Sequence, residues 1–441
     1  MLSTEENDLI SRVGPGTLMG NLMRQYWIPA MLSSELPEPD SDPVRVMLLG
    51  EQLIGFRDTS GRVGLVANSC PHRGASLFYA RNEHDGLRCI YHGWKFDRSG
   101  QCVDMPVERR SFAEQIKTTA YPTHESGGIV WTYMGPPETM TPFRDFGTES
   151  LLPEEVSTTK EFLDCNWIQS LDGDLDGAHI SYLHSWKAME KIPDDGTDRP
   201  GYPSSWMSAR LWAYDRAPRL EVDDAWHGFR YAALRDTPNG YVHARTYAYV
   251  MPYGALISNI PFNTRQLMIV PIDDEHAWRY TVVTQAPHDF SDVTGPSYLN
   301  SPNYPYVLHP LKNGIIERSY TRDNDYQFDR DVQKSATFSG VLEFRSQDLL
   351  VTESMGPRYD RTREHWGTTD AALIRMHALL LQGAKDVAEG KDPLALADGV
   401  HSFTSIRAAE KILEAGEDWR DLGTDDDEMV RRSLADEKVA P

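Results

Sequence analysis

Short runs in which apolar and polar residues alternate characterise the first third of the chain. The clearest are VRVMLLGEQLIGFRDTSGRVGLVAN at 44–68 and GGIVWTYMG at 127–135. Alternation places every second side chain on the same face of a strand, and Gly50, Asp58 and Gly61 are typical of the turns between strands. This region is therefore predicted to form a small antiparallel β domain.

The segments on either side of this β region follow other patterns. The amphipathic stretch TLMGNLMRQYWIPAML at 17–32 predicts a helix that turns at Pro29. Proline and glycine gather in MGPPETMTPFRDFG at 134–147, which is typical of a linker. These breaks indicate separate units before and after the β region.

The second half of the chain mixes both periodicities. Helical character is expected at 160–190, and the clearest helix is expected at 369–390, capped by Thr368 or Thr369 and ending at Gly390. Strands are expected at RYAALRD (230–236), VHARTYAYVMP (242–252) and WRYTVVTQ (278–285). The fold class is therefore α+β.

Four units follow from these patterns, with boundaries that the changes in composition suggest. They are an N-terminal helical segment at 1–37, a β domain at 38–150, a larger α+β domain at 151–425 and a charged tail at 426–441.

Composition and charge narrow the function. The 441 residues include 40% hydrophobic residues, enough for sizeable cores, and no uncharged apolar run near 18 residues, so no membrane span is expected. A net charge of −22 would repel phosphate backbones, which argues against nucleic acid as a partner. The acidic start MLSTEENDLISRVG does not resemble a secretory signal, so a cytoplasmic location is expected.

Two short loops each contain one cysteine and one histidine. Cys70 and His72 lie in CPHRG, and Cys89 and His92 lie in CIYHGW. Two thiolates and two imidazoles could bind one Zn²⁺, or a [2Fe–2S] cluster with the cysteines on one iron and the histidines on the other. Zinc fingers usually pair like ligands within a loop, whereas here each loop offers one of each kind, which favours the cluster.

A second group of ligands lies in CNWIQSLDGDLDGAHISYLH at 165–184. Asp176 and His179 would share a helix face, while His179 and His184 are five residues apart and could reach one metal only if the helix is distorted there. Two histidines and a carboxylate form the facial triad of non-haem Fe(II) oxygenases, which leaves positions open for O₂ and substrate.

These motifs together resemble the α subunits of Rieske ring-hydroxylating oxygenases, and the chain is most similar to the phthalate dioxygenase branch. CPHRG and C-x-YHGW match the Rieske loops, and NW-x-Q-x-L-x-GD-x-D-x-x-H-x₄-H at 166–184 matches the iron segment. QDLLVTESMGPRYDRTREHWGTTDAALIRM at 347–376 is similar to a later block of that branch. Asp172 departs from the glutamate that is common there, and 254–270 matches no member closely.

The resemblance implies a fold, cofactors and partners. The fold would be a Rieske β domain followed by a helix-grip domain, in which an antiparallel sheet surrounds a long helix. The cofactors would be a Rieske [2Fe–2S] cluster and a mononuclear Fe(II), with O₂ as co-substrate and NADH as the electron source through a separate flavin- and ferredoxin-type reductase. Similar proteins assemble as head-to-tail homotrimers, or as hexamers.

The resemblance also assigns roles to single residues. It implies Asp348 as the carboxylate ligand of the iron, with Glu353 as the alternative. Asp176 would link His92 of a neighbouring subunit to His179 at the iron, which gives electrons a short path.

The substrate is expected to be an aromatic carboxylate of the phthalate, benzoate or phenoxybenzoate kind. Read as a strand, 241–252 places His243, Arg245, Tyr247 and Tyr249 on one face, and an arginine among aromatic rings suits a flat ring that bears a carboxylate. Arg245 also aligns with an arginine that resembles the carboxylate anchor of the branch, and Arg210 is a second candidate.

The expected reaction is dihydroxylation of the ring during catabolism of aromatic compounds. The main alternative is a Rieske monooxygenase or O-demethylase on the same scaffold. A non-catalytic Rieske electron carrier or a zinc-binding protein is a more distant alternative, because the carrier would need only about 100 residues.

Overall fold

The alternating residues between 44 and 67 form three antiparallel strands, as the pattern predicts. In the computed structural model of the chain, β2 (Val44–Leu48), β3 (Glu51–Arg57) and β4 (Val63–Ala67) pair in sequence order, and β9 (Ala120–Tyr121) extends the sheet. The structure describes residues 1–145, 148, 156–189, 198–203, 205–259, 263–284, 311–394 and 403–423.

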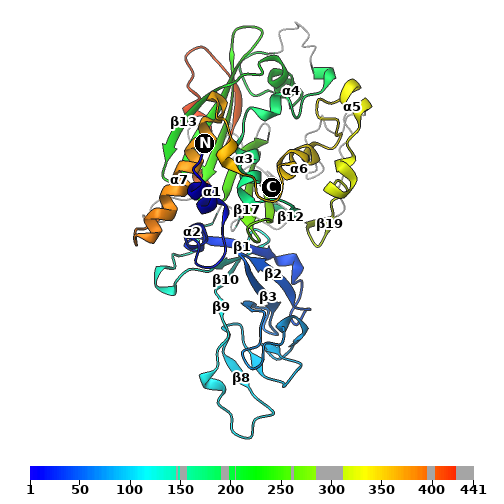
Figure 1. Cartoon of the computed structure of the whole chain (residues 1–441). Helices are drawn as coiled ribbons and strands as arrows, with labels where there is room; N and C mark the ends of the chain where they lie inside the picture. Colours follow the sequence, from blue (N-terminus) through cyan, green and yellow to red (C-terminus); the bar gives the residue numbers. More distant parts are fainter. Residues whose placement is uncertain are drawn as a thin grey trace, which may run out of the picture.

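A second small sheet carries the two Cys–His loops. It consists of β5 (Arg81–Asn82), β6 (Leu87–Arg88), β7 (Lys95–Phe96) and β8 (Cys102–Asp104). Figure 1 shows that β8 lies at the far end of an extension that leads away from the larger part of the molecule. The β domain therefore presents its loops at a distance from the large sheet of the same chain.

The N-terminal segment differs from its prediction. Helices α1 (Thr4–Ser11) and α2 (Leu18–Arg24) form, but the chain then continues as strand β1 (Trp27–Leu32), so the predicted turn at Pro29 is wrong. β1 is the edge strand of a sheet with β11 (Ile129–Tyr133) and β10 (Thr123–Ser126), and the register shifts between Pro29 and Met31. A proline is tolerated there because an edge strand needs no partner on its outer side.

The larger part is built on one long sheet whose strand pairs are antiparallel except for the parallel pair of β12 and β20. Its order is β13-β14-β15-β16-β17-β18-β12-β20-β19, and β21 pairs with the end of β15. The strands are β12 (Val156–Leu163), β13 (Arg219–Ala225), β14 (Gly228–Asp236), β15 (Val242–Val250), β16 (Gly254–Asn259), β17 (Asn263–Pro271), β18 (Ala277–Thr284), β19 (Leu311–Lys312), β20 (Ile315–Ile316) and β21 (Glu410–Leu413). The three predicted strands correspond to β14, β15 and β18.

The larger part also contains helices α3 (Trp167–Leu175), α4 (Ser205–Tyr214), α5 (Arg330–Ser335), α6 (Phe344–Ser354) and α7 (Ala371–Ala388). Of these, α3, α4 and α7 pack on the sheet, and α6 packs on α3. The longest is α7, where the sequence predicted it, although Asp370 rather than a threonine precedes its first turn. It packs against α2, β13 and β14, while α3 packs against β16, β17 and α6 (Figure 1). The predicted combination of a Rieske-type β domain and a sheet that surrounds a long helix is confirmed.

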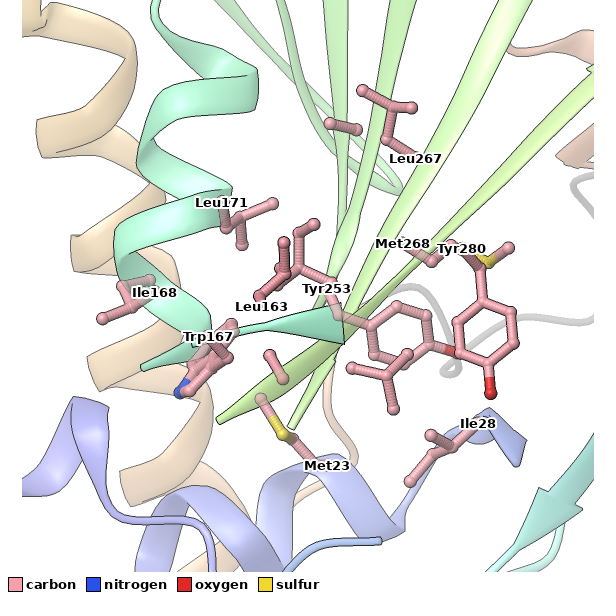
Figure 2. Close-up of a cluster of buried hydrophobic side chains, with 14 of the residues drawn as sticks. Met23, Ile28, Leu163, Trp167, Ile168, Leu171, Tyr253, Leu267, Met268 and Tyr280 are labelled. Carbon is pink, nitrogen blue, oxygen red and sulfur yellow. The ribbon is translucent and has the colours of Figure 1, made fainter. Parts of the chain in front are cut away.

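One hydrophobic core joins the N-terminal segment to the large sheet. Figure 2 shows side chains from α2 and β1 packed against α3 and the sheet, among them Met23, Ile28, Trp167, Tyr253 and Tyr280. Because α3 leads directly into the segment with His179 and His184, this core holds the beginning of that segment in place.

Two further expectations concern residues that the structure does not describe. They are the charged tail at 426–441 and the domain boundary near 150, so both stay predictions. Among the helices that the structure describes, none combines the length and the apolar character that crossing a membrane requires.

Candidate metal centres

The two Cys–His loops have the same backbone design. The amide of Cys70 donates to the carbonyl of Ala75 at 2.8 Å, and the amide of Gly74 donates to the carbonyl of Cys70 at 2.9 Å. The second loop repeats both bonds, from Cys89 to Trp94 and from Gly93 to Cys89, each at 2.9 Å. Both glycines have a φ of +75°, a conformation that residues with a Cβ rarely adopt.

These loops bring the four predicted ligands together. The rings of His72 and His92 lie 4.5 Å apart, and Trp94 stacks on His72 with ring centroids 4.2 Å apart. The two thiols are buried neighbours, and burial, reinforced by Cys89, raises the pKa of Cys70 to about 11. The cysteines are free rather than joined in a disulfide.

This arrangement fits a [2Fe–2S] cluster with mixed ligands. The two adjacent thiols would lose their protons when metal cations bind them. The thiols are buried while the imidazoles of His72 and His92 are partly exposed, so the histidine-bound iron would lie nearer the surface. Ile90 and Tyr91, between the second pair of ligands, have 64% and 54% of their surface exposed.

The segment of the second centre begins where α3 ends. Asp176 and His179 do not share a helix face as predicted, because Asp176 already has an extended backbone. Its Oδ1 accepts hydrogen bonds from the amides of Ala178 (2.7 Å) and His179 (3.3 Å), a side-chain turn that ends the helix. A short 3₁₀ helix at His179–Ser181 follows, and this is the distortion that the spacing of the two histidines required.

Three candidate ligands converge at this point. His179 Nε2 and His184 Nε2 lie 3.3 Å apart, and Asp348 Oδ1 lies 3.1 Å from His184 Nε2 and 3.6 Å from His179 Nε2. Asp348 comes from α6, more than 160 residues later in the chain. One ligand atom from each residue lies within 4.8 Å of the others, which is the spacing that a single metal ion needs.

The electrostatics of this triad suit a divalent cation. Burial alone would raise the pKa of Asp348, but His184 and Arg345 hold it well below its ordinary value, so the carboxylate is ionised. Burial lowers the pKa of His179, which favours the neutral imidazole that metals bind. Two nitrogens and one carboxylate are the donor set of a non-haem Fe(II) site.

Glu353, the alternative carboxylate, serves another purpose. It forms a two-point ion pair with Arg318 at 2.7 and 2.9 Å and accepts a hydrogen bond from Tyr326 at 2.7 Å. It is fully engaged in this buried contact and is not grouped with the histidines. The structure therefore brings Asp348, and not Glu353, to the triad.

Residues of the sheet hold the loop from 176 to 181, here termed the iron loop. Arg235 on β14 donates through Nη2 to the carbonyl of Gly177 at 2.7 Å and to Oγ of Ser181 at 3.2 Å. Tyr231 donates to the carbonyl of Leu175 at 2.6 Å. The position of His179 is therefore tied to β14 on both sides.

Arg245 lies on the same face of the sheet as these contacts. In the register of β14 and β15, Ala233 faces Arg245 and Tyr231 faces Tyr247, so the predicted face is confirmed. The rings of Tyr231 and Tyr247 stack 4.6 Å apart. A Cβ added at Gly177 would lie 3.3 Å from Cε2 of Tyr247, so the iron loop rests directly on this face.

Aromatic rings and one carboxylate surround the guanidinium of Arg245. The ring centroid of Trp212 on α4 lies 4.8 Å from Cζ of Arg245, and that of Tyr247 lies 5.5 Å from it. Glu410 on β21 lies 3.9 Å from its Nε, and burial would raise the pKa of Glu410, but Arg245 and His243 lower it to about 2. Arg210, the second predicted anchor, is buried on α4 two residues before Trp212.

Sequence reasoning missed several residues that shape this site. Gln347 and Phe344 contact His184, and Glu410 contacts Arg245 and His243. No pattern in the sequence marked Glu410 as a site residue, because it lies on the short strand β21, far along the chain from Arg245. Gln347 precedes Asp348 directly, and its position beside a proposed ligand was the one available sign.

Comparison with known families covers nearly the whole chain. Residues 26–122 match the Rieske [2Fe-2S] domain, and residues 132–440 match a model described as LigXa C-terminal domain like. The first match contains both Cys–His loops, and the second contains the triad.

Curated relatives of similar length support the same assignment. The chain is 36% identical to a phthalate 4,5-dioxygenase oxygenase subunit of Pseudomonas putida, over 96% of this chain and 94% of the relative. It is 34% identical to a 3-chlorobenzoate-3,4-dioxygenase oxygenase subunit of Comamonas testosteroni, over 95% and 97%. Among solved structures, NdmA with caffeine from Pseudomonas putida CBB5 has the same fold, with a TM-score of 0.59, 17% identity and coverage of 91% and 100%.

Proposed function

The chain belongs to the Rieske oxygenase family, and from this premise we propose that it dihydroxylates an aromatic carboxylate as the oxygenase component of a two-component system. A separate reductase would deliver electrons from NADH. The single observation that carries the proposal is that one chain holds two separate sets of metal-binding side chains, in the two domains that this family joins.

We assign the ligands residue by residue. Cys70 and Cys89 would bind one iron of the cluster and His72 and His92 the other, while His179, His184 and Asp348 would bind the mononuclear iron. When bound, the cluster supplies electrons one at a time and the ferrous ion supplies the chemistry that activates O₂. The side chains around the two metal centres would connect the centres and bind the substrate.

Asp176 has the geometry of a connecting residue. While its Oδ1 holds the turn, its Oδ2 faces His179 Nδ1 at 3.7 Å, and this buried nitrogen has no hydrogen-bond partner among the described residues. Asp176 is partly exposed, so a second subunit can reach it. We propose that His92 of a neighbouring copy binds here, in a head-to-tail trimer or a hexamer built from trimers.

The form of the β domain agrees with such an assembly. Its loops project away from the large sheet of the same chain (Figure 1), and the exposed side chains of Ile90 and Tyr91 give the loop an apolar surface. The cytoplasm is the proposed location, because its reducing conditions keep Cys70 and Cys89 available as metal ligands.

The substrate is proposed to bind through Arg245, with Arg210 nearby on α4. The guanidinium of Arg245 offers a charge for a carboxylate, and the nearby rings of Trp212 and Tyr247 offer flat surfaces for an aromatic ring. Tyr247 also contacts the iron loop, so a ring bound there would lie on the same side of the sheet as the triad.

Replacing Arg245 with glutamine should impair the reaction of carboxylate substrates selectively. The loss of a charge-assisted hydrogen bond costs about 1.5–3 kcal/mol, so kcat/KM should fall about 10- to 100-fold. The matched control is the uncharged amide of the same substrate, measured with both proteins, because its kcat/KM should change much less. Equal losses for the acid and the amide would contradict the role of Arg245.

The reaction itself is tested with a panel of aromatic carboxylates, a compatible reductase, NADH and labelled O₂. We expect NADH oxidation that depends on the substrate and two labelled oxygen atoms on neighbouring ring carbons. One labelled atom, or release of an alkyl group as an aldehyde, would identify a monooxygenase or O-demethylase instead. Absence of any O₂-dependent product across the panel would reject the aromatic carboxylate as substrate.

A further inference from the structure

Helix α6 contributes more to the mononuclear site than the ligand Asp348. Gln347 and Asp348 follow Phe344 by three and four residues, so each lies beside Phe344 on the helix surface, and all three contact His184. Each contact is to a different part of the imidazole. Phe344 covers the ring, Gln347 contacts Nδ1 and Asp348 contacts Nε2.

The amide of Gln347 can have only one orientation here. Its Nε2 donates to the carbonyl of Val341 at 2.7 Å, and a carbonyl can only accept. The other end of the amide, Oε1, therefore faces Nδ1 of His184, which lies 2.7 Å away. Gln347 is completely buried, so water does not compete for either bond.

This orientation determines which nitrogen of His184 carries the proton. Because Oε1 of Gln347 accepts, Nδ1 must donate, and Nε2 is left with its lone pair. That lone pair points to the place where Asp348 Oδ1 and His179 Nε2 also converge, at 3.1 and 3.3 Å. The ring plane is fixed as well, since Phe344 stacks on it with centroids 3.8 Å apart and an angle of 16°.

His179 is supported differently. Its Nδ1 has no hydrogen-bond partner among the described residues, and the nearest carboxylate oxygen, Oδ2 of Asp176, lies 3.7 Å away on a partly exposed side chain. One histidine of the pair is thus fixed by a buried neutral amide, and the other faces a carboxylate near the surface.

We propose that Gln347 is a positioning residue that holds His184 in the tautomer and ring orientation that metal binding requires. With Phe344 it prepares the lone pair of His184 before any metal arrives, and it leaves His179 as the ligand that responds to Asp176. This role does not depend on the identity of the substrate.

The test measures binding of Fe(II) to protein that has been depleted of mononuclear iron but retains its coloured cluster. Gln347→Leu removes the acceptor, and Gln347→Asn is too short to span both partners. Both variants should lose about 10- to 100-fold in Fe(II) affinity, the usual cost of losing a group that supports a metal ligand. Gln347→Glu retains an acceptor oxygen for Nδ1, so its affinity should lie closer to that of the wild type.

Two further measurements separate positioning from general damage. The electron paramagnetic resonance spectrum of the nitric oxide complex of the mononuclear site should change in Gln347→Leu and Gln347→Asn, because Nδ1 of His184 has lost the acceptor that orients it, while the cluster spectrum stays unchanged. The matched control is Gln382→Leu, which makes the same substitution at an exposed position of α7 and should leave affinity and spectra unchanged.

The proposal has clear contrary results. Wild-type affinity and an unchanged spectrum in Gln347→Leu or Gln347→Asn would overturn it. A Gln347→Glu variant that is as weak as Gln347→Leu would also overturn it, because the acceptor oxygen would then not be the cause. If Gln347→Leu does not fold, the Fe(II) affinities of Gln347→Asn and Gln347→Glu test the proposal, and equal affinities in these two variants would overturn it.

Discussion

The His179→Ala variant is expected to lose turnover completely while it keeps the red-brown colour of its cluster. His179 supplies one of three converging donor atoms, and the two that remain, from His184 and Asp348, are too few to hold iron firmly. The loss should exceed the roughly 100-fold that removal of a supporting neighbour costs a metal site. The four predicted cluster ligands lie in another domain and are untouched.

The measurement compares substrate-dependent NADH oxidation, visible absorption and iron content in the variant and the wild type. His365→Ala is the matched control, because His365 is an exposed histidine of the same domain. A variant that loses its colour would show that His179 belongs to the cluster site. A variant that keeps all its iron and its turnover would show that His179 is not a ligand.

Asp176→Asn should slow turnover by about 10- to 100-fold although both metal centres stay filled. Asparagine retains an oxygen that can accept from the amides of Ala178 and His179, so the turn persists. What it lacks is the second carboxylate oxygen that faces His179 Nδ1 and that would contact the neighbouring subunit. The path between the two centres is then broken while their ligands remain in place.

Iron content, cluster absorption and the rate at which the reduced cluster is reoxidised in a single turnover test this directly. The reoxidation rate should fall by the same factor as steady-state turnover. If turnover is normal, or if loss of mononuclear iron explains the whole decrease, Asp176 does not have the connecting role.

Local patterns in the sequence predicted the parts of the site that are local in the chain. Cys70 and His72 lie in one loop, and a second loop with the same pair of residue types favoured a two-iron cluster over a zinc site. The distortion between His179 and His184 also followed from spacing, since a regular helix could not serve both.

Contacts between distant segments could not be predicted in this way. No periodicity relates Asp348 to His184, and only the resemblance to a known family pointed to it. Gln347 and Glu410 acquire their roles from how α6 and β21 pack, which the sequence around them does not encode. The same limit explains the error at Pro29. A proline fits in β1 because β1 is an edge strand, and the local sequence does not show that β1 lies at the edge of its sheet.

Each chain is expected to bind a cluster of two irons and, separately, a single iron. Measuring metals and acid-labile sulfide in the purified wild-type protein tests this expectation. We expect about three iron atoms and two sulfides per chain, and removal of about one iron by a mild chelator without loss of colour. One metal per chain, or zinc without sulfide, would contradict it.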